Sequence, residues 1–182
     1  MASVLVILAE GFEEIEAVAV IDILRRAEIN TVVAGLKEGF ITSARGVKVI
    51  PDCTLESISA GNFDMVVLPG GMPGTMNLAA DPRVKAIVSS MYNDGKYTAA
   101  ICAAPFVLSE AGVLNGKTAT SHPSFQDKIK ATTVSKTDRV VIDGKVVTSQ
   151  GAGTAIEFAL KIVELFCGAE RSESIHAAMV CS

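Results

Sequence analysis

The chain has 182 residues, of which 49% are hydrophobic and 20% charged, a composition typical of a folded globular protein and not of a disordered chain. With 16 Lys and Arg against 20 Asp and Glu, the net charge is −4, so the basic footprint of a nucleic-acid-binding protein is missing. The longest run without charges, Met65–Ala80, contains two prolines and three glycines and is too short to span a bilayer. We therefore expect a single domain over residues 1–182, with neither a membrane nor a nucleic acid as partner.

Four cysteines are spread widely along the chain, and no two of them have the spacing of a zinc or dithiol motif. With only two histidines besides, we expect no metal site. A chain of this length has core enough without disulfides, which favours free thiols and a reducing compartment. The apolar segment Met1–Ala9 has no basic leader and is interpreted as a strand rather than a secretion signal. The expected location is the cytoplasm, with an organelle left open.

Apolar runs and turn residues predict alternating strands and helices along the chain. The expected strands are Ser3–Ala9, Thr31–Leu36, a short pair Phe40–Thr42 and Val47–Ile50, Asp64–Leu68, Thr98–Cys102, Lys117–Ser121, and a hairpin of Arg139–Ile142 and Lys145–Ser149 around Asp143-Gly144. The expected helices are Glu13–Ala27, Pro82–Met91, Pro105–Ala111, Thr154–Phe166 and Ser172–Met179. This order predicts an α/β sandwich with a mostly parallel sheet and helices on both faces.

In the first helix, the spacing of Ile15, Val18, Ile21 and Leu24 or Ala27 indicates one shared apolar face. In folds of this class, binding and catalytic residues lie at the carboxyl ends of the strands. The loops expected there are Glu10–Glu16, Pro69–Gly74, Cys102–Pro105 and Ser149–Thr154.

Cys102 is the candidate nucleophile, because it lies where a buried strand meets the helix that begins near Pro105. The residues two positions before and two after it are alanines, as a tight strand-turn-helix elbow requires. Unpaired N–H groups at the start of the helix favour a thiolate. The Ala103 N–H is a candidate oxyanion donor, and the turn Gly70-Gly71 offers a second. The alternative interpretation is a cysteine that is simply buried in the core.

Glu16 and His122 are candidate partners of this cysteine. A buried, protonated Glu16 could donate a hydrogen bond to a thiolate and transfer protons, although acids in a first helical turn also occur as simple dipole partners. His122 follows a strand end and could act as a base, with an ordinary turn histidine as the alternative.

Two glycine motifs do not indicate a cofactor. Gly116-Lys117-Thr118 lacks the upstream glycine of a phosphate loop, since Ala111 stands in its place. Gly151-Ala152-Gly153 has Ile156 where a dinucleotide loop needs its third glycine, and is interpreted as a tight turn before a helix. No cofactor is therefore expected.

From about Val4 to Gly168 the sequence resembles the ThiJ/PfpI superfamily, and its parkinsonism-associated deglycase branch most closely. The strings that carry the resemblance are LAEGFEEIE at 8–16, VLPGG at 67–71, AAICAAP at 99–105 and TSQGAGT at 148–154.

The resemblance implies a flavodoxin-like sandwich in which Cys102 is a nucleophile of low pKa on a strained elbow. It also implies that Glu16 is a protonated carboxyl touching the sulfur, with Gly71 and Ala103 as backbone donors and His122 near the pocket. Arg45 matches an arginine that reaches the pocket across a homodimer interface. The superfamily's peptidase branch has a histidine directly after the cysteine, where this chain has Ala103, so a peptidase is not expected.

Three functions are open at this point. The first is a glyoxalase and deglycase that needs neither glutathione nor metal: Cys102 attacks methylglyoxal or its adducts with amines, and the product is a hydroxy acid such as lactate. The second is an oxidative-stress sensor and redox-regulated chaperone that uses the same oxidisable thiol. The third is a small-molecule binding module with a vestigial site, which predicts an ordinary thiol pKa.

Overall fold

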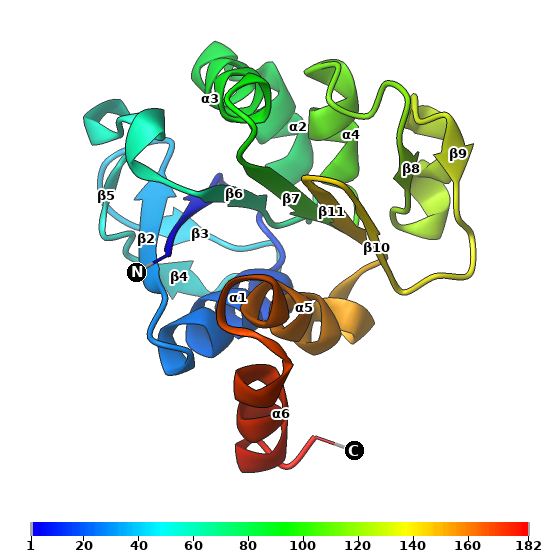
Figure 1. Cartoon of the computed structure of the whole chain (residues 1–182). Coiled ribbons are helices and arrows are strands. Elements are labelled where there is room, and N and C mark those ends of the chain that lie inside the picture. Colours follow the sequence, from blue (N-terminus) through cyan, green and yellow to red (C-terminus); the bar gives the residue numbers. More distant parts are fainter. Residues whose placement is uncertain (1, 182) are drawn as a thin grey trace.

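The computed structural model describes residues 2–181, in which a twisted seven-stranded sheet lies between two layers of helices (Figure 1). The strands are, in spatial order, β10 (Val140–Asp143), β11 (Val146–Ser149), β7 (Tyr97–Ile101), β6 (Met65–Leu68), β1 (Ser3–Leu8), β2 (Asn30–Gly35) and β5 (Cys53–Thr54). All neighbours pair in parallel except β10, which is antiparallel to β11. The expected flavodoxin-like α/β sandwich with a mostly parallel sheet is confirmed.

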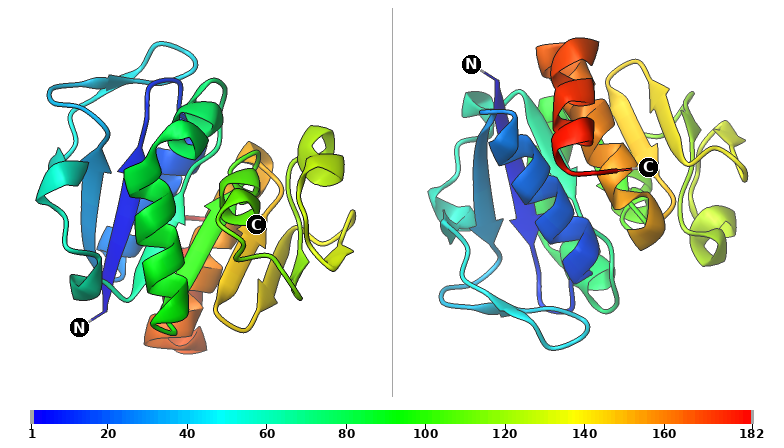
Figure 2. Two further views of the ribbon diagram at one scale, coloured as in Figure 1. Left: turned by 90° about the horizontal axis from the view of Figure 1, so that it is seen from above. Right: turned by 90° about the horizontal axis from the view of Figure 1, so that it is seen from below.

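The helices form two groups, one on each face of the sheet (Figure 2). On one face lie α1 (Glu14–Arg26) and α5 (Ala155–Cys167), with α6 (Ala169–Ala178) packed on α5. On the other face lie α2 (Gly74–Ala80), α3 (Pro82–Asn93) and α4 (Pro105–Glu110). Each layer closes its own apolar core against the sheet.

Short elements lie outside the main sheet. They are the hairpin of β3 (Ile41–Thr42) and β4 (Lys48–Val49), the parallel pair β8 (Thr118–Ala119) and β9 (Thr133–Val134), and the 3₁₀ turns Leu55–Ser57, Ala60–Asn62, Pro123–Lys128 and Ala152–Thr154. The β3–β4 hairpin is attached to the loop before α1, because the Gly11 N–H donates to Thr42 O and the Ala44 N–H to Phe12 O, each at 2.7 Å.

The centre of the sheet explains the continuous apolar runs of the sequence. Every residue of Val4–Leu8 is completely buried, because side chains alternate between the two cores along the strand. Burying one such side chain stabilises the fold by about 1.5–3 kcal/mol. The same packing fixes where β1 ends, and hence where the loop that follows it begins.

The apolar face expected for the first helix is confirmed at its carboxyl end and wrong at its start. Leu24 and Ala27 are buried as expected, but Ile15 and Val18 are 56% and 47% exposed, and Glu16 and Val20 are completely buried instead. The helix is apolar on more than one side, so its periodicity alone does not determine which side packs. Two apolar side chains of α1 consequently point into solvent, and an acid lies in the core.

Further differences concern short elements. The helix α2 and the strands β5 and β9 have no counterpart among the expected elements, since two-residue strands leave no periodic pattern and α2 begins with a glycine. The expected hairpin is present, but Asp143 pairs with Val146, so its turn consists of Gly144 and Lys145.

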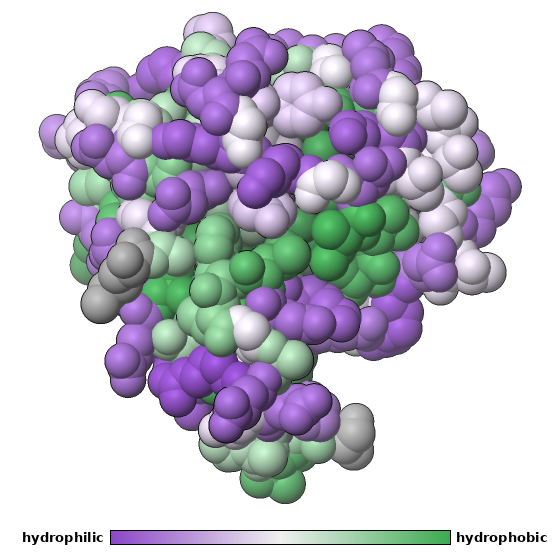
Figure 3. Space-filling model, in the orientation of Figure 1, coloured by the Kyte–Doolittle hydropathy of each residue, from purple (hydrophilic) through white to green (hydrophobic). Residues whose placement is uncertain are grey.

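The face of the molecule seen in Figure 3 is largely polar, with an apolar band between the two helical layers. Within residues 2–181, no helix has the length and apolarity needed to cross a membrane.

Candidate active site

Four loops at one edge of the sheet assemble the site. They follow β1, β6, β7 and β11, which are adjacent strands in the sheet order and all run in the same direction. Their carboxyl ends therefore meet at one edge, as expected from the sequence. The loops bring together Glu16, the Gly70-Gly71 turn, Cys102 and the segment Ser149–Thr154, which we call the 149–154 loop.

Cys102 lies on a sharp turn between β7 and α4. Its φ of +66° is in the left-handed region, which costs a side-chain-bearing residue on the order of 1–3 kcal/mol. Two hydrogen bonds hold this conformation: the Cys102 N–H donates to Ser149 O at 2.9 Å, and the His122 N–H donates to Cys102 O at 2.7 Å. The thiol is partly exposed. The backbone thus has the strained elbow geometry that the family resemblance implies.

Glu16 is an acid buried completely beside this thiol. Its Oε2 accepts a hydrogen bond of 2.8 Å from the Gly70 N–H, while Oε1 is buried and accepts none from the described residues. Burial raises the pKa of Glu16 to about 7, against the smaller opposing effects of Cys102 and of the Gly70 N–H. A carboxyl with such a pKa exchanges its proton near neutral pH, as a general acid and base requires.

Burial also raises the pKa of the Cys102 thiol, to about 12, and the negative charge of an ionised Glu16 is the second cause. This direction is opposite to the low thiol pKa that the resemblance implies. The two groups form a coupled pair, in which a negative charge on one group raises the pKa of the other. A thiolate at Cys102 is therefore favoured only while the proton of the pair remains on Glu16.

Glycines let the loops come this close together. Gly71 has a φ of +93°, and a Cβ there would collide with the backbone of Gly11 and Phe12 at 2.6 Å. A Cβ on Gly70 would lie 2.7 Å from Cys102 Cβ and 2.8 Å from Glu16 Oε2. Both contacts are tighter than a side chain permits, so both positions require glycine.

The candidate oxyanion donors have different roles in the structure. Hydrogen bonds from the N–H groups of Ala103 and Gly71 lower the pKa of Cys102, in opposition to its burial. The Gly70 N–H is engaged by Glu16 instead, and Gly70 O accepts from the Glu13 N–H at 2.9 Å. Gly70 therefore supports the acid rather than offering a free donor to substrate.

His122 lies beside Cys102, as the capping residue of the turn Pro123–Lys128. A Cβ placed on Gly151 would lie 3.6 Å from His122 Cδ2 and 4.0 Å from Cys102 Sγ, so the ring and the sulfur flank the same point. The ring Nδ1 accepts from the Ser124 N–H at 3.2 Å. Nδ1 also lies 2.8 Å from Ser124 Oγ, so Ser124 contacts this nitrogen through both its backbone and its side chain.

Arg45 is the sequence candidate that the structure does not bring to the site. It is exposed in the turn between β3 and β4, and no hydrogen bond or ion pair joins it to another described residue. Its expected role depends on a second copy of the chain and stays a prediction.

Sequence reasoning assigned no role to individual residues of the 149–154 loop. Thr154 is 5% exposed, and its Oγ1 accepts from the Gly151 N–H at 3.1 Å and lies 2.6 Å from Ser149 Oγ. The available signal was the position of this loop at a strand end, directly before a helix.

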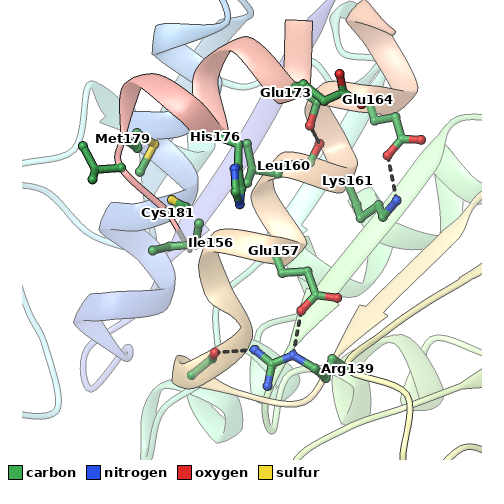
Figure 4. A pocket seen from close by; sticks show the side chains of 13 residues that line it. Arg139, Ile156, Glu157, Leu160, Lys161, Glu164, Glu173, His176, Met179 and Cys181 are labelled. Carbon is green, nitrogen blue, oxygen red and sulfur yellow. Dashed lines mark hydrogen bonds and ion pairs between the residues drawn. The ribbon is translucent and has the colours of Figure 1, made fainter. Parts of the chain in front are cut away.

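A groove of about 700 Å³ lies away from Cys102, between α5, α6 and the end of the described chain (Figure 4). In it Arg139 pairs with Glu157 at 2.7 Å, and His176 and Cys181 contribute to its lining. Neither here nor elsewhere in residues 2–181 do three or more His, Cys, Asp or Glu side chains gather as potential metal ligands.

Comparison with known proteins agrees with this geometry. The profile of the DJ-1/PfpI family matches residues 2–165. The Parkinson disease protein 7 homolog of Danio rerio is 43% identical over 181 residues, covering 97% of this chain and 95% of that protein. The glutathione-independent glyoxalase DJR-1.2 of Caenorhabditis elegans is 36% identical over 167 residues, covering 91% and 89%. The crystal structure of Drosophila melanogaster DJ-1beta superposes with a TM-score of 0.96 at 40% identity, covering 100% of this chain and 98% of that one.

Proposed function

Because the chain belongs to the DJ-1/PfpI family, we propose that it is a glyoxalase acting on methylglyoxal-type dicarbonyls without glutathione, with Cys102 as nucleophile. The observation that carries the proposal is the pairing of a thiol on a strained elbow with a fully buried carboxyl whose pKa is raised to about 7. The name of the 36% identical C. elegans relative is consistent with this reaction.

The first step forms a bond between sulfur and substrate. In the reactive form of the pair, the proton is on Glu16 and the negative charge on Cys102. The sulfur attacks the aldehyde carbon, and the carbonyl oxygen takes the Glu16 proton, which gives a hemithioacetal and a Glu16 carboxylate. The N–H groups of Ala103 and Gly71 stabilise negative charge in this region.

The second step is an internal proton transfer that leaves the number of atoms unchanged. Glu16 removes the proton from the former aldehyde carbon and delivers it to the neighbouring ketone oxygen, giving an enediol. The hydroxyl proton of the first carbon then moves to the second carbon, which yields a thioester. We assign to His122 the role of a hydrogen-bond donor through Nε2 to the substrate oxygens.

In the last step water cleaves the thioester, which releases the hydroxy acid and restores the thiol. Methylglyoxal plus one water thus becomes lactate, with no net oxidation. The same site would act as a deglycase on a dicarbonyl adduct of an amine. There the sulfur displaces the amine, which leaves with a proton, and the resulting hemithioacetal follows the same path.

The test follows lactate by proton NMR during incubation with methylglyoxal in the absence of glutathione. We expect lactate from the native protein and from Cys181→Ala, a matched control that keeps Cys102. Cys102→Ala should form less than about 1% of that lactate, because no sulfur is available for attack. Lactate formation at the native rate by Cys102→Ala would refute the mechanism.

We propose as a second candidate function a redox sensor with a redox-regulated chaperone role. The hydrogen-bond donors around the Cys102 sulfur favour it. One peroxide converts the thiol to sulfenic acid and water, and a second converts sulfenic to sulfinic acid and water. The Glu16 carboxyl and the Ala103 and Gly71 N–H groups would hold the sulfinate oxygens.

We expect mild peroxide to add two oxygens selectively at Cys102, as measured by peptide mass spectrometry. In Glu16→Leu the sulfinate should give way to the sulfonic acid, because the donor that holds its oxygens is lost. Equal oxidation of all four cysteines would contradict the sensor function.

A further inference from the structure

The 149–154 loop contains a glycine that its backbone does not require. Gly151 has a φ of 162°, which is extended backbone open to any residue. A Cβ at this position would meet His122 Cδ2 at 3.6 Å and Cys102 Sγ at 4.0 Å, ordinary van der Waals distances. Gly71, by contrast, needs glycine for both its φ and its space. The absence of a side chain at position 151 therefore leaves open a space between the sulfur and the imidazole ring.

The position of this glycine is fixed relative to the sulfur. The Thr154 hydroxyl lies 2.8 Å from Gly151 O and accepts from the Gly151 N–H at 3.1 Å. Arg139 donates to Gly153 O at 2.8 Å, a contact drawn in Figure 4, and the Ser149 hydroxyl donates to Arg139 O at 2.7 Å. Ser149 O in turn accepts from the Cys102 N–H. The loop and the elbow therefore form one hydrogen-bonded assembly.

A Cβ at position 151 would lie 4.0 Å from Cys102 Sγ, so the space that Gly151 leaves open borders the atom to which a substrate carbon becomes bonded. We propose that Gly151 is a specificity-determining residue: its missing side chain makes room for the acyl substituent of an α-oxoaldehyde between Cys102 and His122. The substrate class in this inference rests on the proposed function. The space beside Cys102 that Gly151 leaves open can be measured without turnover.

The first experiment measures turnover of glyoxal, methylglyoxal and phenylglyoxal, in which the group beyond the second carbonyl grows from hydrogen to methyl to phenyl. In Gly151→Ala we expect kcat/KM to change less than about twofold for glyoxal and to fall more than about tenfold for phenylglyoxal, with methylglyoxal between them. Gly153→Ala is the matched control, because a Cβ there meets nothing within 4 Å. Equal losses on all three substrates, or no loss on any, would overturn the inference.

The second experiment needs no catalysis and separates this inference from the proposed function. The alkylation rates of Cys102 by N-ethylmaleimide and by the smaller iodoacetamide are compared by peptide mass spectrometry. Gly151→Ala should lower the ratio of the N-ethylmaleimide rate to the iodoacetamide rate at least about fivefold, because the added methyl group hinders the larger reagent more. Gly153→Ala should leave this ratio within about twofold of the native value. An unchanged ratio in Gly151→Ala refutes the inference. A protein that turns over no dicarbonyl but shows the lowered ratio refutes only the proposed function.

A further variant keeps the test decisive should Gly151→Ala fold poorly. Thr154→Val preserves the shape of the side chain and removes the hydroxyl that holds Gly151 in place. It should raise the N-ethylmaleimide to iodoacetamide ratio at least about twofold relative to Thr154→Ser, which keeps the hydroxyl. A ratio that is equal in both variants counts against the fixed position of Gly151.

Discussion

At the scale of single residues, Glu16 is the acid to which we assign proton transfer in the proposed reaction, and its burial also lowers the stability of the fold. A carboxyl with no exposed surface and one accepted backbone hydrogen bond is poorly stabilised in its charged form. Its pKa of about 7 in the folded protein lies above the value of 4.5 in a solvated chain. The folded state therefore binds a proton that the unfolded chain has already lost between these two pH values.

We predict from this shift that the stability contributed by Glu16 is fully present below pH 4.5 and is lost as the pH rises through 7. The loss amounts to about 3 kcal/mol. The difference in unfolding free energy between Glu16→Gln and the native protein should therefore move in favour of the variant by about 3 kcal/mol from pH 4 to pH 8. Urea denaturation at several pH values measures this difference.

The exposed Glu38 provides the control for that measurement, because Glu38→Gln changes the same chemical group in solvent. Its effect on the unfolding free energy should stay nearly constant across the same pH range. A Glu16→Gln curve that runs parallel to the native curve at every pH would mean that Glu16 titrates as an ordinary surface acid.

The sequence alone predicts the elbow at Cys102 but not the burial of the neighbouring Glu16. The elbow could be predicted because alanines flank the cysteine at the tight turn and a helix follows. The burial of Glu16 could not, since it depends on which side of α1 meets the sheet, and Ile15, directly before Glu16, is 56% exposed. The expected low thiol pKa also depends on burial, which a one-dimensional pattern does not contain.

At the scale of secondary structure, long buried strands were predictable and short pairings were not. A continuous apolar run such as that of β1 indicates a strand buried on both faces, because all of its side chains are removed from water on folding. The strands β5 and β9, of two residues each, exist because neighbouring strands and loops are already in place. The 149–154 loop is similar, because its role arises from contacts with Arg139 and Cys102 rather than from its own sequence.

At the scale of the whole molecule, exposed apolar side chains mark a surface beside the site. Ile15 and Val18 on α1 are 56% and 47% exposed, and Val47 and Ile50 at the β3–β4 hairpin are 47% and 81% exposed. The hydrogen bonds between the hairpin and the loop before α1 place these two elements side by side. Exposed apolar side chains on elements that are joined in this way are typical of a protein–protein contact.

We predict that this surface is the interface of a homodimer, which would also give Arg45 a partner. Native protein should sediment at twice the chain mass of 19.0 kDa, and Ile15→Glu should shift it to the monomer mass at micromolar concentration. The matched control is Ile142→Glu on β10, where an isoleucine is 42% exposed outside this surface. A native monomer, or equal dissociation by both variants, would contradict the interface.

The close approach of two backbone segments at Gly71 limits where such a protein can acquire new substrates. The loop with Gly11 and the turn with Gly71 leave no room for a side chain at either glycine, so most substitutions at these two positions should prevent folding. Position 151 faces the same sulfur but accepts a side chain without collision. We therefore expect substitutions that change the substrate range, whether natural or selected from a library, to occur in the 149–154 loop. The glycine turn on the other side of the cysteine should remain unchanged.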